Sequence, residues 1–409
     1  MVVVNKPDGV IRICGEYKVT INSQLEIDQY PLPRVENIFA ALQGSKFFTK
    51  LDLSRAYLQM DLEEESQKFT TINTIQGLYK STRLPFGVAC APAIFQIFME
   101  NLLRDLPFCS CYLDDVLIHG GVNEKEHWEH VKIVLKRFQE ANVRLHFKKC
   151  LFAVQEVEHL GHILGQDGVK PSTKKVTAVL NAIEPENITQ LRSFLGLVTY
   201  YGKFIPALSS VAHPLHKLLH KDSAWRWGKP EKLAWNKLKG LLPSSRMLTH
   251  YSLDLPLRLA CDASSFGLGA VLSHRMPDGS ERPVAYASRS LSPSEKNYSQ
   301  LDKEALSIVF GVKRFHPYLY GRKFTLITDH KPLLAMLGST SGLPTLTAAR
   351  MQRWALILSA YFYDLEFRPT AEHSNADALS RCPLPDSSQH QDYDHCYSME
   401  FLSEGPLTF

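Results

Sequence analysis

The stretch that most constrains the fold runs from residue 108 to 120, FCSCYLDDVLIHG. Short apolar runs rich in aromatic and β-branched residues flank the adjacent aspartates Asp114 and Asp115. This pattern predicts a β-hairpin with two carboxylates at its tip. Such carboxylates repel each other unless a positive charge lies between them, and a hard divalent cation provides one. The alternative at this point is a solvated turn in which the Asp-Asp pair only ends the strands.

Length and composition are those of a globular protein with two or three domains, since the chain has 409 residues, of which 44% are hydrophobic and 22% charged. No run approaches 18 apolar residues, and the first five residues, MVVVN, lack a signal-peptide pattern. We therefore expect a soluble intracellular protein, cytoplasmic or nuclear, that does not enter a membrane. The tail over 383–409 has acidic residues but no Lys or Arg, so the rest of the chain is more basic than the net charge of +4 suggests. That surplus fits a polyanionic partner, although only weakly.

Two more motifs precede the hairpin in the first half of the chain. The segment over 46–53, KFFTKLDL, alternates like a strand and ends near Asp52. The block over 84–96, LPFGVACAPAIFQ, has Pro and Gly before a helix-like apolar pattern. At the start of the chain, Asp8-Gly9 between two apolar runs predicts another hairpin.

These motifs occur in the order and spacing of a reverse transcriptase. The details ICGEYKVTIN, QYPLPR and KLDLSRAY resemble the pol fragment of gypsy-type LTR retrotransposons, which are Metaviridae-like elements. The resemblance implies a right-hand polymerase whose palm carboxylates are Asp52, Asp114 and Asp115. It also implies two Mg²⁺ ions at that site, with Mn²⁺ as a substitute.

The resemblance further implies a nucleotide pocket built from six residues. These are Lys6, Arg12, Tyr57, Phe86, Gly87 and Gln96. The first two match the fingers residues that hold the triphosphate, and Tyr57 matches the aromatic gate that excludes a 2′-hydroxyl. The last three belong to a block that packs against nucleotide and template. From the residues alone, the two cations are also compatible with exposed strand charges, and the two aromatics with an ordinary core.

A second group of carboxylates follows after residue 255. Asp262 ends one predicted strand, and Asp329 follows another. Glu304 lies in a predicted helix over 292–315, which opens on the capping box SPSE. Asp377 comes later, in NADALSR. This order resembles the RNase H family, whose four carboxylates the four acids match, and it implies two more Mg²⁺ ions that act on an RNA–DNA hybrid.

We therefore predict a multidomain α+β and α/β chain, in which a right-hand polymerase (fingers, palm and thumb) precedes an RNase H-like mixed-sheet domain. Residues 1–165 form the fingers and palm, with the fingers truncated at the N-terminus, and 166–250 form the thumb and connection. Residues 251–382 form the RNase H-like domain, and 383–409 form an acidic disordered tail.

The predicted function is RNA-directed DNA polymerase, a nucleotidyltransferase, combined with ribonuclease H, an endoribonuclease. Both sites use two-metal phosphoryl transfer. The expected partners are an RNA template, a DNA primer, an RNA–DNA hybrid and dNTPs. Two alternatives stay open: RNase H activity alone, because the fingers are short, and an idle nucleic-acid-binding relic of a retroelement.

Overall fold

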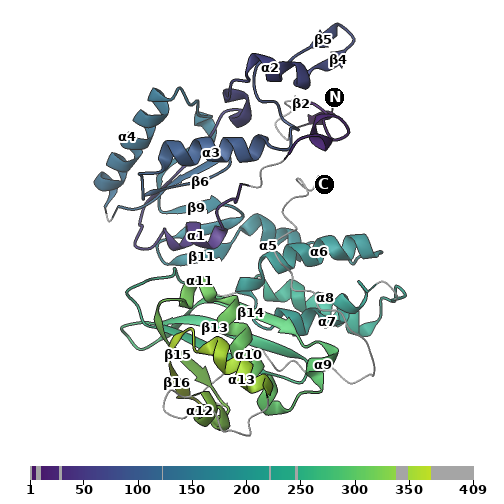
Figure 1. Cartoon of the computed structure of the whole chain (residues 1–409), viewed down its shortest axis with the longest axis vertical. Helices are drawn as coiled ribbons and strands as arrows, with labels where there is room; N and C mark the ends of the chain where they lie inside the picture. The colour runs from purple at the N-terminus through teal and green to yellow at the C-terminus, as the bar shows by residue number, and fades with distance from the viewer. Residues whose placement is uncertain are drawn as a thin grey trace. The chain divides into compact units, whose positions relative to one another are not determined.

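A computed structural model of the chain describes residues 2–5, 11–26, 30–121, 123–220, 223–244, 247–337 and 349–369 (Figure 1). Its backbone divides into two units. The first is Met1–Ser172 with His250–Ser252, and the second is Thr173–Thr249 with Leu253–Phe409. Among the described helices, none has the length and apolar content needed to cross a membrane.

The core of the first unit is a four-stranded antiparallel sheet in the order β6-β7-β3-β8. Its strands are β3 (Phe48–Asp52), β6 (Cys109–Tyr112), β7 (Asp115–Ile118) and β8 (Leu151–Val154). Alternation along β3 buries Thr49 and Leu51 and leaves Lys50 and Asp52 partly exposed. The sheet therefore has one apolar face and one face that carries charged side chains.

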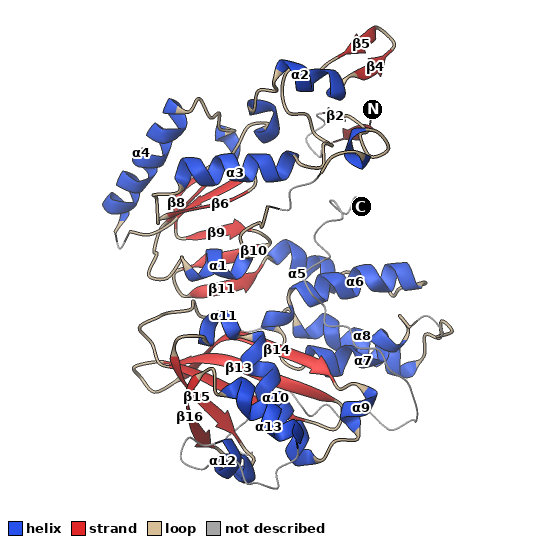
Figure 2. Ribbon diagram, viewed as in Figure 1, coloured by secondary structure: helices blue, strands red, loops and turns tan. Residues whose placement is uncertain are grey.

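Two helices cover the apolar face of this sheet: α3 (Ala91–Leu103), which Figure 2 shows beside β6, and α4 (Glu124–Glu140). Their buried residues, among them Phe95, Met99 and Val134, join Leu51 in one hydrophobic cluster. Helix α4 ends at Glu140, and Asn142 just beyond it has a φ of +54°, in the left-handed region that ends helices.

The remaining strands of the first unit form three small pieces. A three-stranded sheet has the order β11-β10-β9, and two hairpins pair β1 with β2 and β4 with β5. The β1–β2 pairing confirms the hairpin predicted around Asp8-Gly9. The strands are β1 (Val2–Asn5), β2 (Ile11–Cys14), β4 (Ile72–Thr74), β5 (Gly77–Tyr79), β9 (Glu156–His159), β10 (His162–Gly165) and β11 (Gly168–Pro171).

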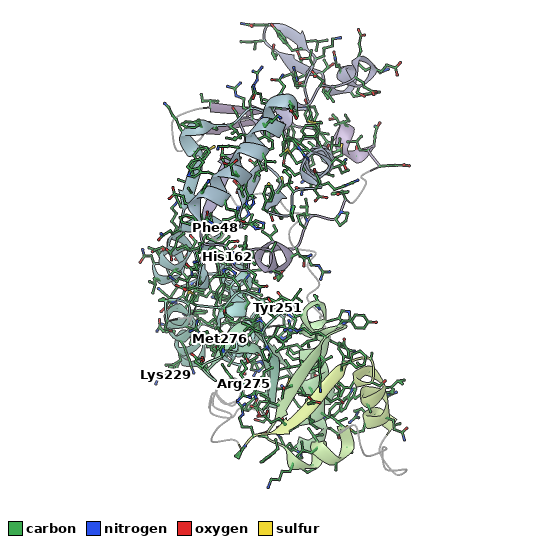
Figure 3. The ribbon with its side chains drawn as sticks, turned by 90° about the vertical axis from the view of Figure 1, so that its left-hand side faces the viewer. Phe48, His162, Lys229, Tyr251, Arg275 and Met276 are labelled. Atoms are coloured by element: carbon green, nitrogen blue, oxygen red, sulfur yellow. The ribbon has the colours of Figure 1, made fainter. Side chains whose placement is uncertain are left out.

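Short helices and helical turns connect the strands of the first unit. These helical elements are η1 (Ile21–Ser23), α1 (Val35–Ala40), η2 (Ala56–Gln59), α2 (Glu64–Gln67), η3 (Lys68–Thr70) and η4 (Phe147–Lys149). One segment from further along the chain, His250–Ser252, also belongs to this unit. The distant segment is held by side chains: His250 Nε2 lies 2.7 Å from the Gly165 carbonyl, and Gln43 Nε2 donates to Ser252 Oγ at 2.6 Å. Figure 3 labels Phe48, His162 and Tyr251 of this unit.

The second unit begins with a group of helices. They are α5 (Thr173–Leu180), α6 (Ile188–Tyr200), η5 (Gly202–Phe204), α7 (Leu208–Lys217) and α8 (Lys229–Leu241). Helix α6 starts at a side-chain cap, because the Asn187 side chain accepts a hydrogen bond from the Gln190 backbone N–H at 2.9 Å. The ring centroids of Phe194 on α6 and Trp235 on α8 are 3.9 Å apart, which joins the two helices.

A five-stranded mixed sheet follows, in the order β14-β13-β12-β15-β16. Strands β12 and β15 pair in parallel, as do β15 and β16, and the other pairs are antiparallel. The strands are β12 (Leu257–Ala263), β13 (Gly267–Arg275), β14 (Glu281–Ser290), β15 (Lys323–Thr328) and β16 (Phe362–Phe367).

The helix predicted over 292–315 is divided in two. The capping box at Ser292 starts only α9 (Pro293–Lys296), and Ser299 caps a new helix by accepting from the Asp302 N–H at 3.1 Å. The single long helix was therefore wrong, because a second local cap competes with the first. The helices after α9 are α10 (Gln300–Arg314), which lies across the sheet in Figure 2, α11 (His316–Leu319), α12 (Lys331–Leu337) and α13 (Ala349–Leu358).

Candidate active sites

The first candidate site lies at one end of the four-stranded sheet. Asp52 ends β3 and Asp115 begins β7, and the two residues are direct partners in the antiparallel register. Asp114 lies in the two-residue turn of the β6–β7 hairpin, and its carbonyl accepts from the Leu53 N–H at 3.3 Å. Because opposite residues of an antiparallel pair share a face, Asp52 and Asp115 present their carboxylates on the same side. The structure thus brings the three predicted carboxylates to one end of the sheet.

The turn of this hairpin is held by Gln96 on α3. Leu113 has a φ of +55°, which is unfavourable for a residue with a Cβ. Gln96 Oε1 accepts from the Leu113 N–H at 2.7 Å, and Gln96 Nε2 donates to the Cys111 carbonyl at 3.1 Å. The Gln96 side chain is fully buried. Its amide therefore supports the hairpin, and a direct contact with nucleotide would require it to leave these partners.

The substitution Gln96→Leu is expected to destabilise the first unit. Leucine fills the space but leaves the part-buried N–H of Leu113 and the buried carbonyl of Cys111 without their partner, at a cost of about 2–4 kcal/mol. The measurement is the shift of the urea unfolding midpoint. Gln139→Leu, at an exposed position on α4, is the matched control, and equal midpoints for the two variants would contradict the role of Gln96.

The two aromatic residues of the predicted nucleotide pocket, Tyr57 and Phe86, lie close together. The ring of Tyr57, on η2, is 5.3 Å from the ring of Phe86 and 5.6 Å from that of Phe95. Tyr57 and Phe86 are both partly exposed. Lys6 and the side chain of Arg12 lie outside the described residues, so their place in a pocket stays a prediction.

Gly87 occupies a position that only glycine fits. Its φ is +102°, and a Cβ at this position would lie 2.4 Å from the Gly15 carbonyl oxygen. The Asn22 side chain also binds here, donating to the Gly87 carbonyl and accepting from the Ala89 N–H, both at 2.9 Å. Gly87 therefore joins the 84–96 block to the chain near residue 15, beside Phe86.

The substitution Gly87→Ala is expected to destabilise the protein by about 2 kcal/mol or more, because it adds both dihedral strain and a backbone clash. Gly77→Ala is the matched control, since Gly77 has a φ of +120° but no atom within 4 Å of an added Cβ. Thermal unfolding of the two variants separates the clash from the strain. Identical losses for both would show that the contact with Gly15 contributes nothing.

The second candidate site lies on the five-stranded sheet. Asp262 is on β12, Asp329 directly follows β15, and Glu304 is on the face of α10 that packs on the sheet. Two turns after Glu304, a Cβ on Gly311 would lie 2.7 Å from Cys261 Sγ, so glycine lets the helix approach β12 closely. This approach brings Glu304 to the strand that carries Asp262.

The three carboxylates form a compact acidic cluster. Asp262, Glu304 and Asp329 each offer an oxygen, and these atoms lie within 4.8 Å of one another. Gln300 Nε2 donates to Glu304 Oε1 at 2.5 Å and to the Ala263 carbonyl at 3.1 Å, which orients the carboxylate. Burial, and then the charges of Asp262 and Asp329, raise the pKa of Glu304 to about 8.

This cluster fits a hard divalent cation. All three donors are carboxylate oxygens, Asp262 and Glu304 are buried, and Glu304 Oε2 has no hydrogen-bond partner among the described residues. The fourth predicted acid, Asp377, lies outside the described residues. Within the described part of the chain, the oxygens of Asp52, Asp114 and Asp115 do not approach one another as closely as those of this cluster.

Comparison with known protein families also divides the chain into two segments, each of which contains one candidate site. Residues 5–164 match the family described as reverse transcriptase (RNA-dependent DNA polymerase), and residues 252–361 match the RNase H-like domain found in reverse transcriptase. The chain carries a reverse transcriptase domain followed by an RNase H-like domain. The order of the two matched segments agrees with the predicted order of the two domains.

The curated relatives of this chain are transposon polyproteins. It is 34% identical over 414 residues to the Transposon Tf2-3 and Tf2-4 polyproteins of Schizosaccharomyces pombe. The alignments cover 99% of this chain and 30% of each relative, so the chain spans about 30% of the length of the relatives it matches. A retrotransposon pol segment with both domains is therefore supported.

Solved structures show the same fold. A foamy viral protease-reverse transcriptase in complex with double-stranded DNA has a TM-score of 0.80 at 22% identity, covering 90% of this chain and 64% of that one. A foamy viral protease-reverse transcriptase in complex with an RNA/DNA hybrid has a TM-score of 0.74 at 21% identity, covering 96% and 52%. The predicted order of a polymerase fold and an RNase H-like mixed sheet is confirmed.

The residues that support the carboxylates were not identified from sequence. Gln96 was assigned to the nucleotide pocket, and Gln300 and Gly311 were not singled out. A helical spacing of four places Gln300 on the face of Glu304, and a spacing of seven does the same for Gly311. That periodicity was the available signal for these two residues, whereas nothing local links Gln96 to a turn seventeen residues further along the chain.

Proposed function

We propose that this chain synthesises DNA on RNA and DNA templates and removes the RNA strand from the resulting hybrid. Its substrates would be dNTPs, a DNA primer and an RNA template. The observation that carries the proposal is the direct pairing of Asp52 with Asp115, beside Asp114, within a domain that matches reverse transcriptases. The foamy viral structures, which hold double-stranded DNA and an RNA/DNA hybrid, support nucleic-acid partners of the same kind.

Both sites would hold Mg²⁺, with Mn²⁺ as a substitute. Asp52, Asp114 and Asp115 would bind two ions in the polymerase domain. In the RNase H-like domain, Asp262, Glu304, Asp329 and Asp377 would bind two. When bound, such ions supply charge that stabilises the attacking and leaving oxygens of phosphoryl transfer.

In the polymerase domain, the main role of the protein would be to hold the three carboxylates and the nucleotide in position. The register of β3 and β7 holds Asp52 opposite Asp115, and Gln96 holds the backbone of the turn that carries Asp114. We infer that the Tyr57 ring meets the sugar of the incoming nucleotide and rejects a 2′-hydroxyl, with Phe86 packed beside it. Lys6 and Arg12 would bind the triphosphate.

In the RNase H-like domain, Glu304 would be the residue that responds to the cation. Its raised pKa means that its carboxyl group holds a proton near neutral pH, and it would release this proton when a cation binds. Gln300 then keeps the Glu304 carboxylate aimed at Asp262 and Asp329.

We also propose the finer assignments of origin and domain limits. The motifs KLDLSRAY and ACDAS, with the Tf2 relatives, support a gypsy-type LTR element. Residues 1–165 would be fingers and palm, 166–250 thumb and connection, and 251–382 the RNase H-like domain. The lysines of the helices in the second segment would contact duplex phosphates.

The test uses the purified full chain with Mg²⁺ in two separate assays. Extension of a DNA primer on an RNA template tests the polymerase, and cleavage of the RNA strand in a labelled hybrid tests the nuclease. Both activities are expected. Cleavage without extension would limit the function to RNase H, and binding of hybrid without either reaction would point to an idle relic.

A further inference from the structure

Lys50 places a positive charge beside the polymerase carboxylates. It lies on β3 two residues before Asp52, so its side chain projects from the same face of the sheet. Lys50 Nζ is 3.2 Å from Asp115 Oδ2, an ion pair that runs diagonally between β3 and β7. The carboxylate of Asp115 thus has a fixed cationic neighbour within its own sheet.

The same ammonium group contacts a second sheet. Lys50 Nζ donates to the Glu158 carbonyl on β9 at 3.4 Å. The neighbouring residue, His159, is buried, and burial together with the charge of Lys50 lowers the pKa of His159 to about 3. His159 is therefore neutral at physiological pH and adds no second positive charge beside Lys50.

The surroundings of the ion pair strengthen it relative to a surface pair. The side chain of Lys50 is 21% exposed and that of Asp115 is 28% exposed, so water screens their attraction only in part. The attraction also keeps the Asp115 carboxylate on the Lys50 side of the site.

We propose that Lys50 is a positioning residue of the polymerase site, where it orients Asp115, ties it to β9 and lowers the affinity of the three carboxylates for divalent cations. The inference rests on the proposed polymerase function. A fixed positive charge near a cation site repels an incoming cation, and it also reduces the mutual repulsion of the carboxylates when no cation is bound.

The test measures binding of Mn²⁺ to the full chain, with free Mn²⁺ detected by electron paramagnetic resonance. The background is Asp262→Asn with Glu304→Gln, which weakens the second acidic cluster. In this background, Lys50→Met is expected to bind Mn²⁺ about tenfold more tightly than the parent. Its melting temperature in EDTA is expected to fall by about 2–4 °C, because the carboxylates lose their counter-charge.

Two further variants define what the charge does. Lys50→Gln removes the charge but can still donate to the Glu158 carbonyl, so it is expected to tighten Mn²⁺ binding as Lys50→Met does, and it decides the question if the methionine variant does not fold. Lys50→Arg keeps the charge and is expected to restore the parental affinity. Lys132→Met removes an exposed ion pair with Glu129 on α4 and is the matched control, with no expected change.

Unchanged or weaker Mn²⁺ binding in both Lys50→Met and Lys50→Gln would overturn the proposal. A tighter affinity in Lys132→Met of equal size would also overturn it, because the effect would then be one of net charge. Primer extension by the unmodified chain is a separate measurement, so failure of the polymerase function and failure of the Lys50 role are distinguishable.

Discussion

Asp114→Asn is expected to reduce primer extension by about 10³-fold or more while leaving cleavage of an RNA–DNA hybrid unchanged. The substitution keeps the size of the side chain but removes a negative charge from the tip of the β6–β7 hairpin. Because this carboxylate would hold a cation only in the polymerase site, the acidic cluster of the second unit is not affected. The measurement is the single-turnover rate of nucleotide addition at saturating Mg²⁺.

The control for this prediction is Asp167→Asn. Asp167 lies in another short hairpin turn of the same unit, between β10 and β11, and is not one of the predicted carboxylates. The Asp167→Asn variant should extend primers at the parental rate. Retention of extension by Asp114→Asn, or an equal loss in Asp167→Asn, would contradict the assignment of the hairpin carboxylate.

Glu304→Gln is expected to abolish hybrid cleavage, to leave primer extension intact and to stabilise the protein in EDTA. The pKa of Glu304 is about 8 in the folded chain, against 4.5 for the ordinary group, because of burial and the charges of Asp262 and Asp329. The raised pKa means that the protonated form is favoured in the folded state. The contribution of Glu304 to stability is therefore fully present below about pH 4.5 and is lost as the pH rises through 8.

Glutamine is neutral at every pH, so the variant should not show the loss of stability that Glu304 causes over this range. The difference in unfolding free energy between Glu304→Gln and the parent should grow from pH 5 to pH 8.5 and reach about 2–4 kcal/mol. Urea unfolding in EDTA across this range measures it. Mg²⁺ should reduce the difference, because a bound cation stabilises the parental carboxylate and not the amide.

Glu186→Gln provides the control, because Glu186 is an exposed carboxylate in the same unit. It should show no pH-dependent difference from the parent. A constant difference for Glu304→Gln between pH 5 and pH 8.5 would mean that Glu304 is ionised throughout that range, and the role of the acidic cluster would need revision.

Much of the proposed polymerase site could be predicted from local sequence. The hairpin around Asp114 and Asp115 follows from two apolar runs that flank polar residues, which is a local pattern, and the structure has it at 109–118. The order of Asp52, the 84–96 block and the hairpin indicated a reverse transcriptase, and the family comparison confirms that domain. The helix start at Ser292 was also correct, because an N-cap acts on backbone groups only three residues away.

Local pattern was insufficient where two signals competed or where a conformation depended on a distant neighbour. The helix over 292–315 is interrupted because Ser299 provides a second cap. Gly87 must lack a Cβ because the Gly15 carbonyl lies against it, and Gly311 must be small because Cys261 lies against it. These contacts join segments far apart in the chain, so the local sequence does not name the partner of either glycine.

By itself, the sequence determined which residues carry charge at strand ends and which chemistry they resemble, because alternation and turn signals are properties of neighbouring residues. Only the tertiary structure decided the pairing of Asp52 with Asp115, the use of Gln96 as a support for the hairpin, and the contact of Lys50 with Asp115. The physical reason is that register and side-chain contacts between strands depend on how the whole sheet and its helices pack. The two aspartates of the hairpin thus belong to a site whose shape is decided by residues on β3, α3 and β9.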